Sequence, residues 1–207
     1  MYSDITGVIL AGGKSTRMGQ NKALLKIGNE LAIERTVKMM RRIFSQLILI
    51  TNTPNEYAFL SLPMYSDLFK QQGPLAGIHA ALKNVESEKV FIISCDMPLI
   101  TEETIRFILD YPSFLPIVVP KADGFVQQLC GIYSRSVVEL AEGLLSSSDE
   151  EEGRDKHQHK RKCKVMSLLE MAGATKIEME QEFGDYKANS FLNMNRLDEY
   201  EAILKLI

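Results

Sequence analysis

The sequence predicts a three-layer α/β protein, in which helices cover both faces of a mostly parallel, twisted sheet. Two observations lead to this prediction. Several segments are continuous apolar runs, such as 47–50, and such runs are typical of strands buried on both faces. Segments with apolar residues at helical spacing lie between them, so strands and helices alternate. The length of 207 residues suits a single domain, 1–207.

The first part of the chain opens with an apolar strand at 5–10. A helix is expected at 31–44, where apolar residues recur one turn apart with basic residues on the other faces. A strand at 47–51, which contains several β-branched residues, completes a strand–helix–strand unit. A short helix at 55–60 and a brief strand at 64–67 follow.

A glycine–proline pair marks the start of a helix at 74–84, because proline is preorganised for the first helical position. The apolar run at 89–94 is expected to be a central strand. Thr101 is a suitable N-cap for a helix at 102–110.

The remaining elements are shorter. We expect strands at 117–120, 127–133, 175–179 and 190–192, and helices at 134–145, 165–172 and 196–205. The highly charged stretch 146–162 contains no apolar residue, so it cannot bury enough surface to offset its ordering entropy. The segment 146–164 is therefore predicted to be a mobile loop.

Composition excludes several classes of protein. Hydrophobic residues make up 45% of the chain, charged residues 25%, and the net charge is −3, so no overall basic field would attract nucleic acid. No apolar run approaches the ~20 residues that span a bilayer, and the N-terminus lacks a signal pattern. Cys95, Cys130 and Cys163 lack metal-ligand spacing. We expect a soluble cytoplasmic protein with reduced thiols and neither a nucleic-acid nor a membrane partner.

The clearest functional signal follows the first strand. Gly12 and Gly13 let backbone amides approach an anion without obstruction by a Cβ atom, while Arg17 and Lys22 add positive charge. This pattern predicts a polyphosphate site; the alternative is a glycine-rich turn with incidental basic residues. The segment is not a P-loop, because Val8 stands where the first glycine belongs, and it lacks the glycine spacing of the dinucleotide fingerprint.

Asp96 is a second candidate. It directly follows the apolar strand at 89–94, at the end of the sheet where ligands of α/β proteins bind. A carboxylate there suits Mg²⁺, which prefers hard oxygen ligands and takes few of them from the protein when phosphates are present. The alternative is an aspartate that caps the following turn.

These motifs resemble those of a known family. The stretch at 10–22, Leu-Ala-Gly-Gly-x-Ser-x-Arg-Met-Gly-x-x-Lys, resembles the signature of nucleotidyltransferases, and most of all that of molybdenum cofactor guanylyltransferases. The stretch 95–98, Cys-Asp-Met-Pro, resembles the metal motif of that family. Asp67, followed by Gly-Pro-Leu-Ala-Gly at 73–77, is similar to its GTP-binding segment. The resemblance covers nearly all of the chain except 146–164.

The resemblance implies a Rossmann-like nucleotidyltransferase fold, with a nucleotide half at about 1–100 and an acceptor half at about 101–207. It implies Mg²⁺-dependent transfer of GMP from GTP to the phosphate of molybdopterin, with release of pyrophosphate. The acceptor would be molybdopterin or molybdenum-molybdopterin, and further partners would be other cofactor-biosynthesis proteins and apo-molybdoenzymes.

The resemblance also implies roles for particular residues. Arg17, Lys22 and Asp96 would be catalytic, with Asp96 holding the metal. The nucleotide would be bound by Leu10, Ala11, Gly12, Gly13, Lys22, Asp67 and Asp96. Asn52 lies near the place where relatives use an asparagine for the nucleotide, but it is equally suited to forming a turn.

The acceptor half departs from the family pattern. The segment 128–133 resembles Gln-Pro-Leu-Cys-x-x-Tyr without its proline, and the segment 191–198 resembles Asn-x-Asn-Thr-Pro-x-Asp with Arg-Leu in place of Thr-Pro. His157 and His159 lack the partners of a zinc site and are expected in a solvated loop, although the basic residues at 160–162 could reach an acceptor phosphate.

Two other functions stay open. One is a cytidylyltransferase acting on molybdopterin or on a sugar or polyol phosphate. The other is a non-catalytic GTP- and cofactor-binding chaperone, against which the combination of Arg17, Lys22 and Asp96 argues.

Overall fold

A computed structural model describes residues 1–12, 21–147 and 164–207. The strands of the main sheet are β1 (Ile5–Leu10), β4 (Leu47–Ile50), β5 (Met64–Tyr65), β6 (Lys89–Ser94), β7 (Ile117–Ala122), β8 (Phe125–Val126), β9 (Cys130–Ser134) and β10 (Ala174–Glu178). The α-helices are α1 (Ala32–Ile43), α2 (Pro74–Asn84), α3 (Glu102–Asp110), α4 (Val138–Ser146), α5 (Lys164–Ala172), α6 (Met179–Glu182) and α7 (Leu197–Leu204). The 3-10 helices are η1 (Lys22–Leu24), η2 (Pro54–Leu60) and η3 (Arg135–Val137).

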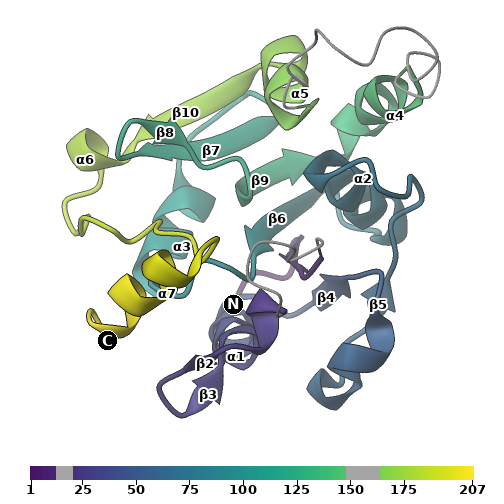
Figure 1. The fold of residues 1–207 in the computed structure, drawn as a ribbon. Helices are drawn as coiled ribbons and strands as arrows, with labels where there is room; N and C mark the ends of the chain where they lie inside the picture. Colours follow the sequence, from purple (N-terminus) through teal and green to yellow (C-terminus); the bar gives the residue numbers. More distant parts are fainter. Residues whose placement is uncertain (13–20, 148–163) are drawn as a thin grey trace, which may run out of the picture.

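The sheet places β1 near its centre. In the described part of the chain the strand order is β10-β7-β9-β6-β1-β4-β5, with β8 paired to β7 (Figure 1). The pairs β1–β4, β1–β6, β4–β5 and β7–β10 are parallel. Strand β9 runs antiparallel to both β6 and β7. The predicted mostly parallel sheet is therefore confirmed, with β9 reversed between β6 and β7.

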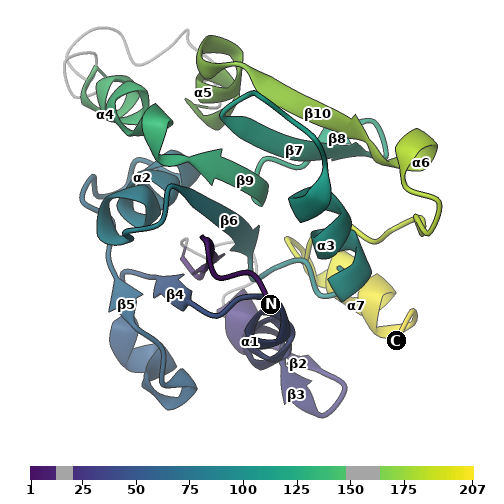
Figure 2. The same ribbon diagram turned by 180° about the vertical axis from the view of Figure 1, so that it is seen from behind.

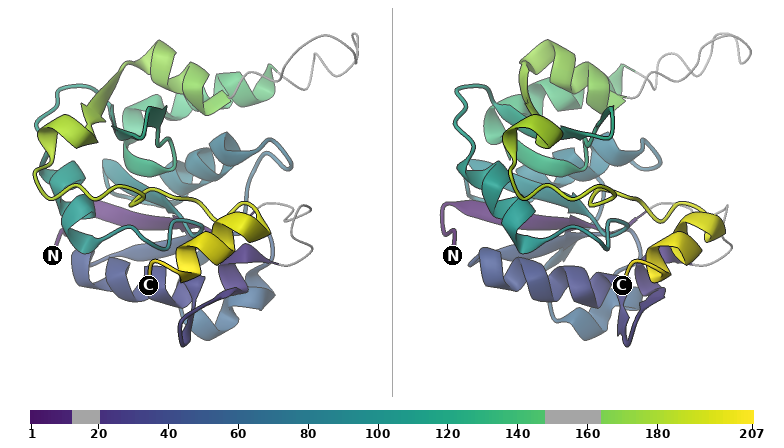
Figure 3. Two further views of the ribbon diagram at one scale, coloured as in Figure 1. Left: turned by 60° about the vertical axis from the view of Figure 1, so that its left-hand side comes forward. Right: turned by 90° about the vertical axis from the view of Figure 1, so that its left-hand side faces the viewer.

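Helices cover both faces of the sheet (Figure 3). Along β1, Ile5 and Ile9 point to the face covered by α1 and α3, whereas Val8 and Leu10 point to the face covered by α2, α4 and α5. This alternation explains why the apolar residues of the strand are not confined to every second position: all six residues are buried, whichever face they lie on.

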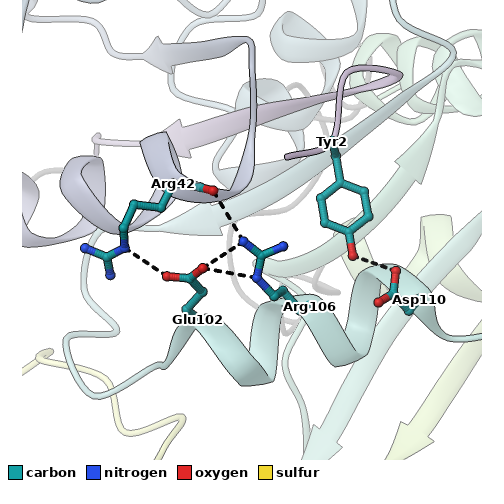
Figure 4. A network of polar contacts seen from close by, with 5 residues as sticks. All are labelled: Tyr2, Arg42, Glu102, Arg106 and Asp110. Atoms are coloured by element: carbon teal, nitrogen blue, oxygen red, sulfur yellow. Dashed lines mark hydrogen bonds and ion pairs between the residues drawn. The ribbon is translucent and has the colours of Figure 1, made fainter.

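Polar contacts connect α1 to α3 at the edge of the first face of the sheet, which is the face that these two helices cover (Figure 4). Glu102 Oε2 accepts a hydrogen bond from Arg42 Nε at 2.9 Å, and its Oε1 accepts one from Arg106 Nη2 at 2.7 Å. Both bonds lower the pKa of the Glu102 carboxyl group, and the Arg42 bond has the larger effect. Tyr2 donates to Asp110 Oδ1 at 2.5 Å, which attaches the N-terminus to the same helix.

A small third core, separate from those on the two faces of the sheet, anchors the C-terminal segment. The hairpin of β2 (Lys26–Ile27) and β3 (Glu30–Leu31) lies beside α7 (Figure 2). Ile27, Met194 and Ile203 are buried together there. The last helix is thereby packed against the segment that follows Lys22, although the two are far apart in sequence.

Most predicted elements are confirmed, and α2 and α3 match the expected ranges, with Thr101 Oγ1 capping α3 through the Thr104 amide. The strand expected at 190–192 is wrong: Asn189 has a φ of 69° and the backbone bonds there are local turns, such as Leu192 N to Asn189 O. The strand expected at 127–133 begins only at Cys130.

The predicted loop 146–164 is too long at both ends, because Ser146 ends α4 and Lys164 begins α5. Residues 148–163 lie outside the described residues, and His157, His159 and Cys163 are among them. The β2–β3 hairpin, β8 and α6 were not expected, since two to four residues are too few for a periodic pattern. Within the described ranges, every helix is too short or too polar to span a bilayer.

Candidate functional site

The candidate site lies where three neighbouring parallel strands end. Leu10 pairs with Ile50 on one side and with Ser94 on the other, so β1, β4 and β6 end level with each other. Backbone bonds continue one residue further: Ala11 N donates to Ile50 O at 3.0 Å and Cys95 N donates to Leu10 O at 3.2 Å. The residues that follow these strands are thus brought to one edge of the sheet.

The start of the predicted phosphate loop continues from β1. Leu10 is buried, as is Ala11, whose amide is already used by the sheet. Gly12 is exposed, and a Cβ atom built on it would meet nothing within 4 Å. An open backbone at Gly12 is compatible with close approach of a phosphate. Gly13 and Arg17 lie outside the described residues.

Lys22 is fixed at the first position of η1. The preceding residue, Asn21, caps this turn with its Oδ1, which accepts from Ala23 N at 3.1 Å. The Lys22 ammonium donates to Asn195 Oδ1 at 2.8 Å. Burial raises the pKa of the Cys95 thiol, with the adjacent Asp96 charge adding to this, while the positive charge of Lys22 opposes it. Lys22 therefore lies within electrostatic reach of the segment that carries Asp96.

Asp96 follows β6 and has a buried carboxylate oxygen. Its Oδ1 has no hydrogen-bond partner among the described residues, and an unpaired buried carboxylate oxygen is energetically costly. Its carbonyl accepts from Met194 N at 2.9 Å, which holds the turn in place. A divalent cation would satisfy the orphaned oxygen. The described residues contain no cluster of three His, Cys, Asp or Glu side chains, so phosphate or water would complete the coordination shell.

Asp67 and Asn52 form a reciprocal pair after β4 and β5. Asn52 Nδ2 donates to Asp67 Oδ2 at 2.8 Å, and Asp67 N donates to Asn52 Oδ1 at 3.1 Å. A Cβ atom on Gly77, in the first turns of α2, would lie 3.7 Å from Asp67 Oδ1 and 3.3 Å from Leu10 Cδ2. Only the contact with Leu10 would be tight, and the distance to Asp67 is an ordinary van der Waals contact, so the start of α2 packs beside both residues.

Burial raises the pKa of the Asp67 carboxyl group above 3.8, and the Asn52 bond only partly opposes this. The folded protein thus binds this proton more tightly than the unfolded chain, so stability from this group is present below pH 3.8 and is lost as the pH rises through the raised pKa. We expect Asp67→Asn to raise the melting temperature at about pH 7 but not at about pH 3. Thermal melts at both values check this, and an unchanged gain at the lower pH would contradict it.

Several residues of the two predicted acceptor motifs are buried or make contacts that stabilise the fold. Cys130 is buried and faces Ile93 across the β6–β9 ladder. Tyr133 is buried and its hydroxyl donates to Gln128 O at 2.6 Å. Asn193 bonds to Phe191 O, and Asp198 is exposed on α7. The sequence motifs gave no role to Asn21. Asn195 belongs to a predicted acceptor motif, but its contact with Lys22 could not be predicted because the two residues are 173 positions apart.

Comparisons with known proteins identify relatives of this chain. A family described as "MobA-like NTP transferase domain" matches residues 7–162. A probable molybdenum cofactor guanylyltransferase of Carboxydothermus hydrogenoformans is 40% identical over 204 residues, covering 98% of this chain and 96% of that protein. A relative of the same description from Clostridium perfringens is 30% identical over 97% of this chain and 96% of its own length.

Solved structures share the fold. Molybdopterin-guanine dinucleotide biosynthesis protein A of Archaeoglobus fulgidus has a TM-score of 0.78 at 21% identity, with 98% of both chains covered. A Mycobacterium tuberculosis protein in complex with manganese has a TM-score of 0.69 at 20% identity, over 98% of this chain and 99% of that one. Sequence identity at full length, the matched domain and the shared fold together show that this chain belongs to the molybdenum cofactor guanylyltransferase family.

Proposed function

We propose that this protein transfers GMP from GTP to the phosphate of molybdopterin and releases pyrophosphate. The single observation that carries the proposal is the buried Oδ1 of Asp96, which has no partner among the described residues. Asp96 follows β6 at the edge of the sheet where β1 also ends, and Asn195, in the segment that bonds to Asp96, contacts Lys22. Such an oxygen suits a metal that also takes phosphate oxygens. The names of the relatives, probable molybdenum cofactor guanylyltransferases, support guanine as the base.

In this reaction an oxygen of the acceptor phosphate attacks the α-phosphorus of GTP, and the bond to the β-phosphate oxygen breaks. The acceptor is already an anion, so no strong general base is required. The chain's contribution is then positioning and electrostatic stabilisation. Lys22 and Arg17 would hold the triphosphate and stabilise the charge of the leaving pyrophosphate, and the amides at Gly12 and Gly13 would contact its oxygens.

Asp96 would hold Mg²⁺, which supplies charge neutralisation for the phosphates when bound. The manganese complex of the structural relative supports a divalent cation without distinguishing Mg²⁺ from Mn²⁺. The Asp67–Asn52 pair would contact the nucleoside, beside Gly77 in the first turns of α2. We further propose that the protein acts in the cytoplasm, with other cofactor-biosynthesis proteins and apo-molybdoenzymes as partners.

The test is pyrophosphate release from each of the four nucleoside triphosphates in the presence of molybdopterin and either Mg²⁺ or Mn²⁺. We expect release with GTP only, dependent on both the acceptor and the metal. Release with CTP in place of GTP would identify a cytidylyltransferase. Tight GTP binding without release under any condition would identify a non-catalytic carrier.

A further inference from the structure

Asn195 holds the functional group of Lys22 from the opposite end of the chain. Lys22 Nζ lies 2.8 Å from Asn195 Oδ1, and the pair is partly buried. The segment containing Asn195 also bonds to the turn that carries Asp96, since Met194 N donates to Asp96 O at 2.9 Å. The short segment 194–195 therefore contacts both Lys22 and Asp96, the candidate metal ligand.

The backbone around Asn195 leaves its side chain little freedom. Met194 is fully buried in the small core formed by the β2–β3 hairpin and α7. Glu199, in the first turn of α7, accepts from Asn195 N at 2.6 Å and from Arg196 N at 3.0 Å. The side-chain oxygen of Asn195 is thus presented to Lys22 by a segment that is fixed on both sides.

The backbone of Lys22 is fixed equally well. The side-chain amide of Asn21 donates to Glu56 Oε2 at 2.7 Å and to Tyr57 Oη at 2.8 Å, while its Oδ1 caps η1. The flexible part of Lys22 is its four-carbon side chain, and among the described residues it is the Asn195 oxygen that contacts its end.

An amide oxygen is suited to this task. It accepts one of the three ammonium protons and leaves two for phosphate oxygens, and because it is neutral it does not cancel the positive charge. We propose that Asn195 is a positioning residue that acts through Lys22 and preorganises the ammonium group for the triphosphate of the substrate. This inference depends on the proposed function, in which Lys22 contacts the triphosphate.

The experiment is a double-mutant cycle measured as GTP affinity by titration calorimetry and as KM and kcat of pyrophosphate release. Asn195→Ala is expected to weaken GTP binding about tenfold in the wild-type background, as loss of one contact to a charged group does, and less than about twofold beside Lys22→Ala. Asn195→Asp is expected to weaken GTP binding more than Asn195→Ala, because a carboxylate would neutralise Lys22 and repel phosphate.

A matched control distinguishes the orientation of Lys22 by Asn195 from a general loosening of the C-terminal segment. The Tyr200 hydroxyl donates to Lys26 O at 2.7 Å, so Tyr200→Phe loosens the contact between α7 and the same hairpin without touching Lys22. It is expected to lower the melting temperature and leave GTP affinity within about twofold of wild type.

Equal losses from Asn195→Ala in both backgrounds, or equal effects of Tyr200→Phe and Asn195→Ala on GTP affinity, would overturn the positioning role. If wild-type protein neither binds GTP nor releases pyrophosphate, the proposed function fails on its own. The same cycle is then run with inorganic tripolyphosphate, and coupling there would still support the action of Asn195 on Lys22, whereas its absence would refute it.

Discussion

Asp96→Asn is expected to lower the rate of pyrophosphate release by roughly 10²-fold or more, the order of loss found when one preorganised electrostatic group is removed from a reaction centre. The substitution keeps the size of the side chain but removes the charge that would hold a divalent cation. Because Asp96 Oδ1 has no partner in the described structure, no protein hydrogen bond of that oxygen is broken. The melting temperature without added metal is therefore expected to stay unchanged or to rise.

The same variant is expected to lose the stabilisation that Mn²⁺ gives to wild-type protein in the presence of GTP, since a ligand stabilises only the state that binds it. Asp110→Asn is the matched control, because Asp110 lies on α3 and accepts from Tyr2 at the edge of the first face. Full activity of Asp96→Asn, or an activity loss in Asp110→Asn of the same size, would show that Asp96 has no special role.

Gly131→Ala is expected to destabilise the protein by about 3 kcal/mol, at the upper end of the range for overpacking a rigid site. A Cβ atom on Gly131 would lie 2.3 Å from the Val118 carbonyl oxygen and 2.9 Å from Val119 Cγ1. The carbonyl belongs to the neighbouring strand β7, so relief requires movement of the sheet backbone. The free energy of unfolding in urea measures the effect.

Gly143→Ala provides the contrast. Gly143 is exposed in α4, and a Cβ atom there would meet nothing within 4 Å. Alanine is expected to stabilise the protein by about 0.5–1 kcal/mol, because glycine loses more backbone entropy in a helix. Similar unfolding free energies for the two variants would refute the steric argument for Gly131.

Much of the fold could be predicted because its signals are local. The apolar runs of β1 and β6, the proline that starts α2 and the threonine that caps α3 each act within a few residues. The failures lie where the local pattern is weak. In the segment 190–192, Phe191 is buried and Leu192 is partly buried by packing of turns, and the two-residue strands β2 and β3 are stabilised by pairing with each other.

The candidate site shows the same division. A glycine-rich segment after an apolar strand, and an aspartate after another, could be recognised because each motif is contiguous in sequence. Asn21 and Asn195 could not be assigned to Lys22 in this way: Asn21 contacts η2, 35 and 36 residues away, and Asn195 approaches from the segment that precedes α7. Contacts of that kind leave no periodicity in the sequence.

The sequence by itself determined the layered α/β class and the family, because hydrophobic periodicity and contiguous motifs are local features of the chain. It also predicted the phosphate-loop motif and Asp96 as site residues, and these stay predictions. The tertiary structure decided that β9 is reversed, that Gly131 has no room for a side chain, and that the C-terminal segment reaches Lys22 and Asp96. The physical reason is that these features depend on close packing and hydrogen bonding between distant segments, which exist only once the sheet and its helices have assembled.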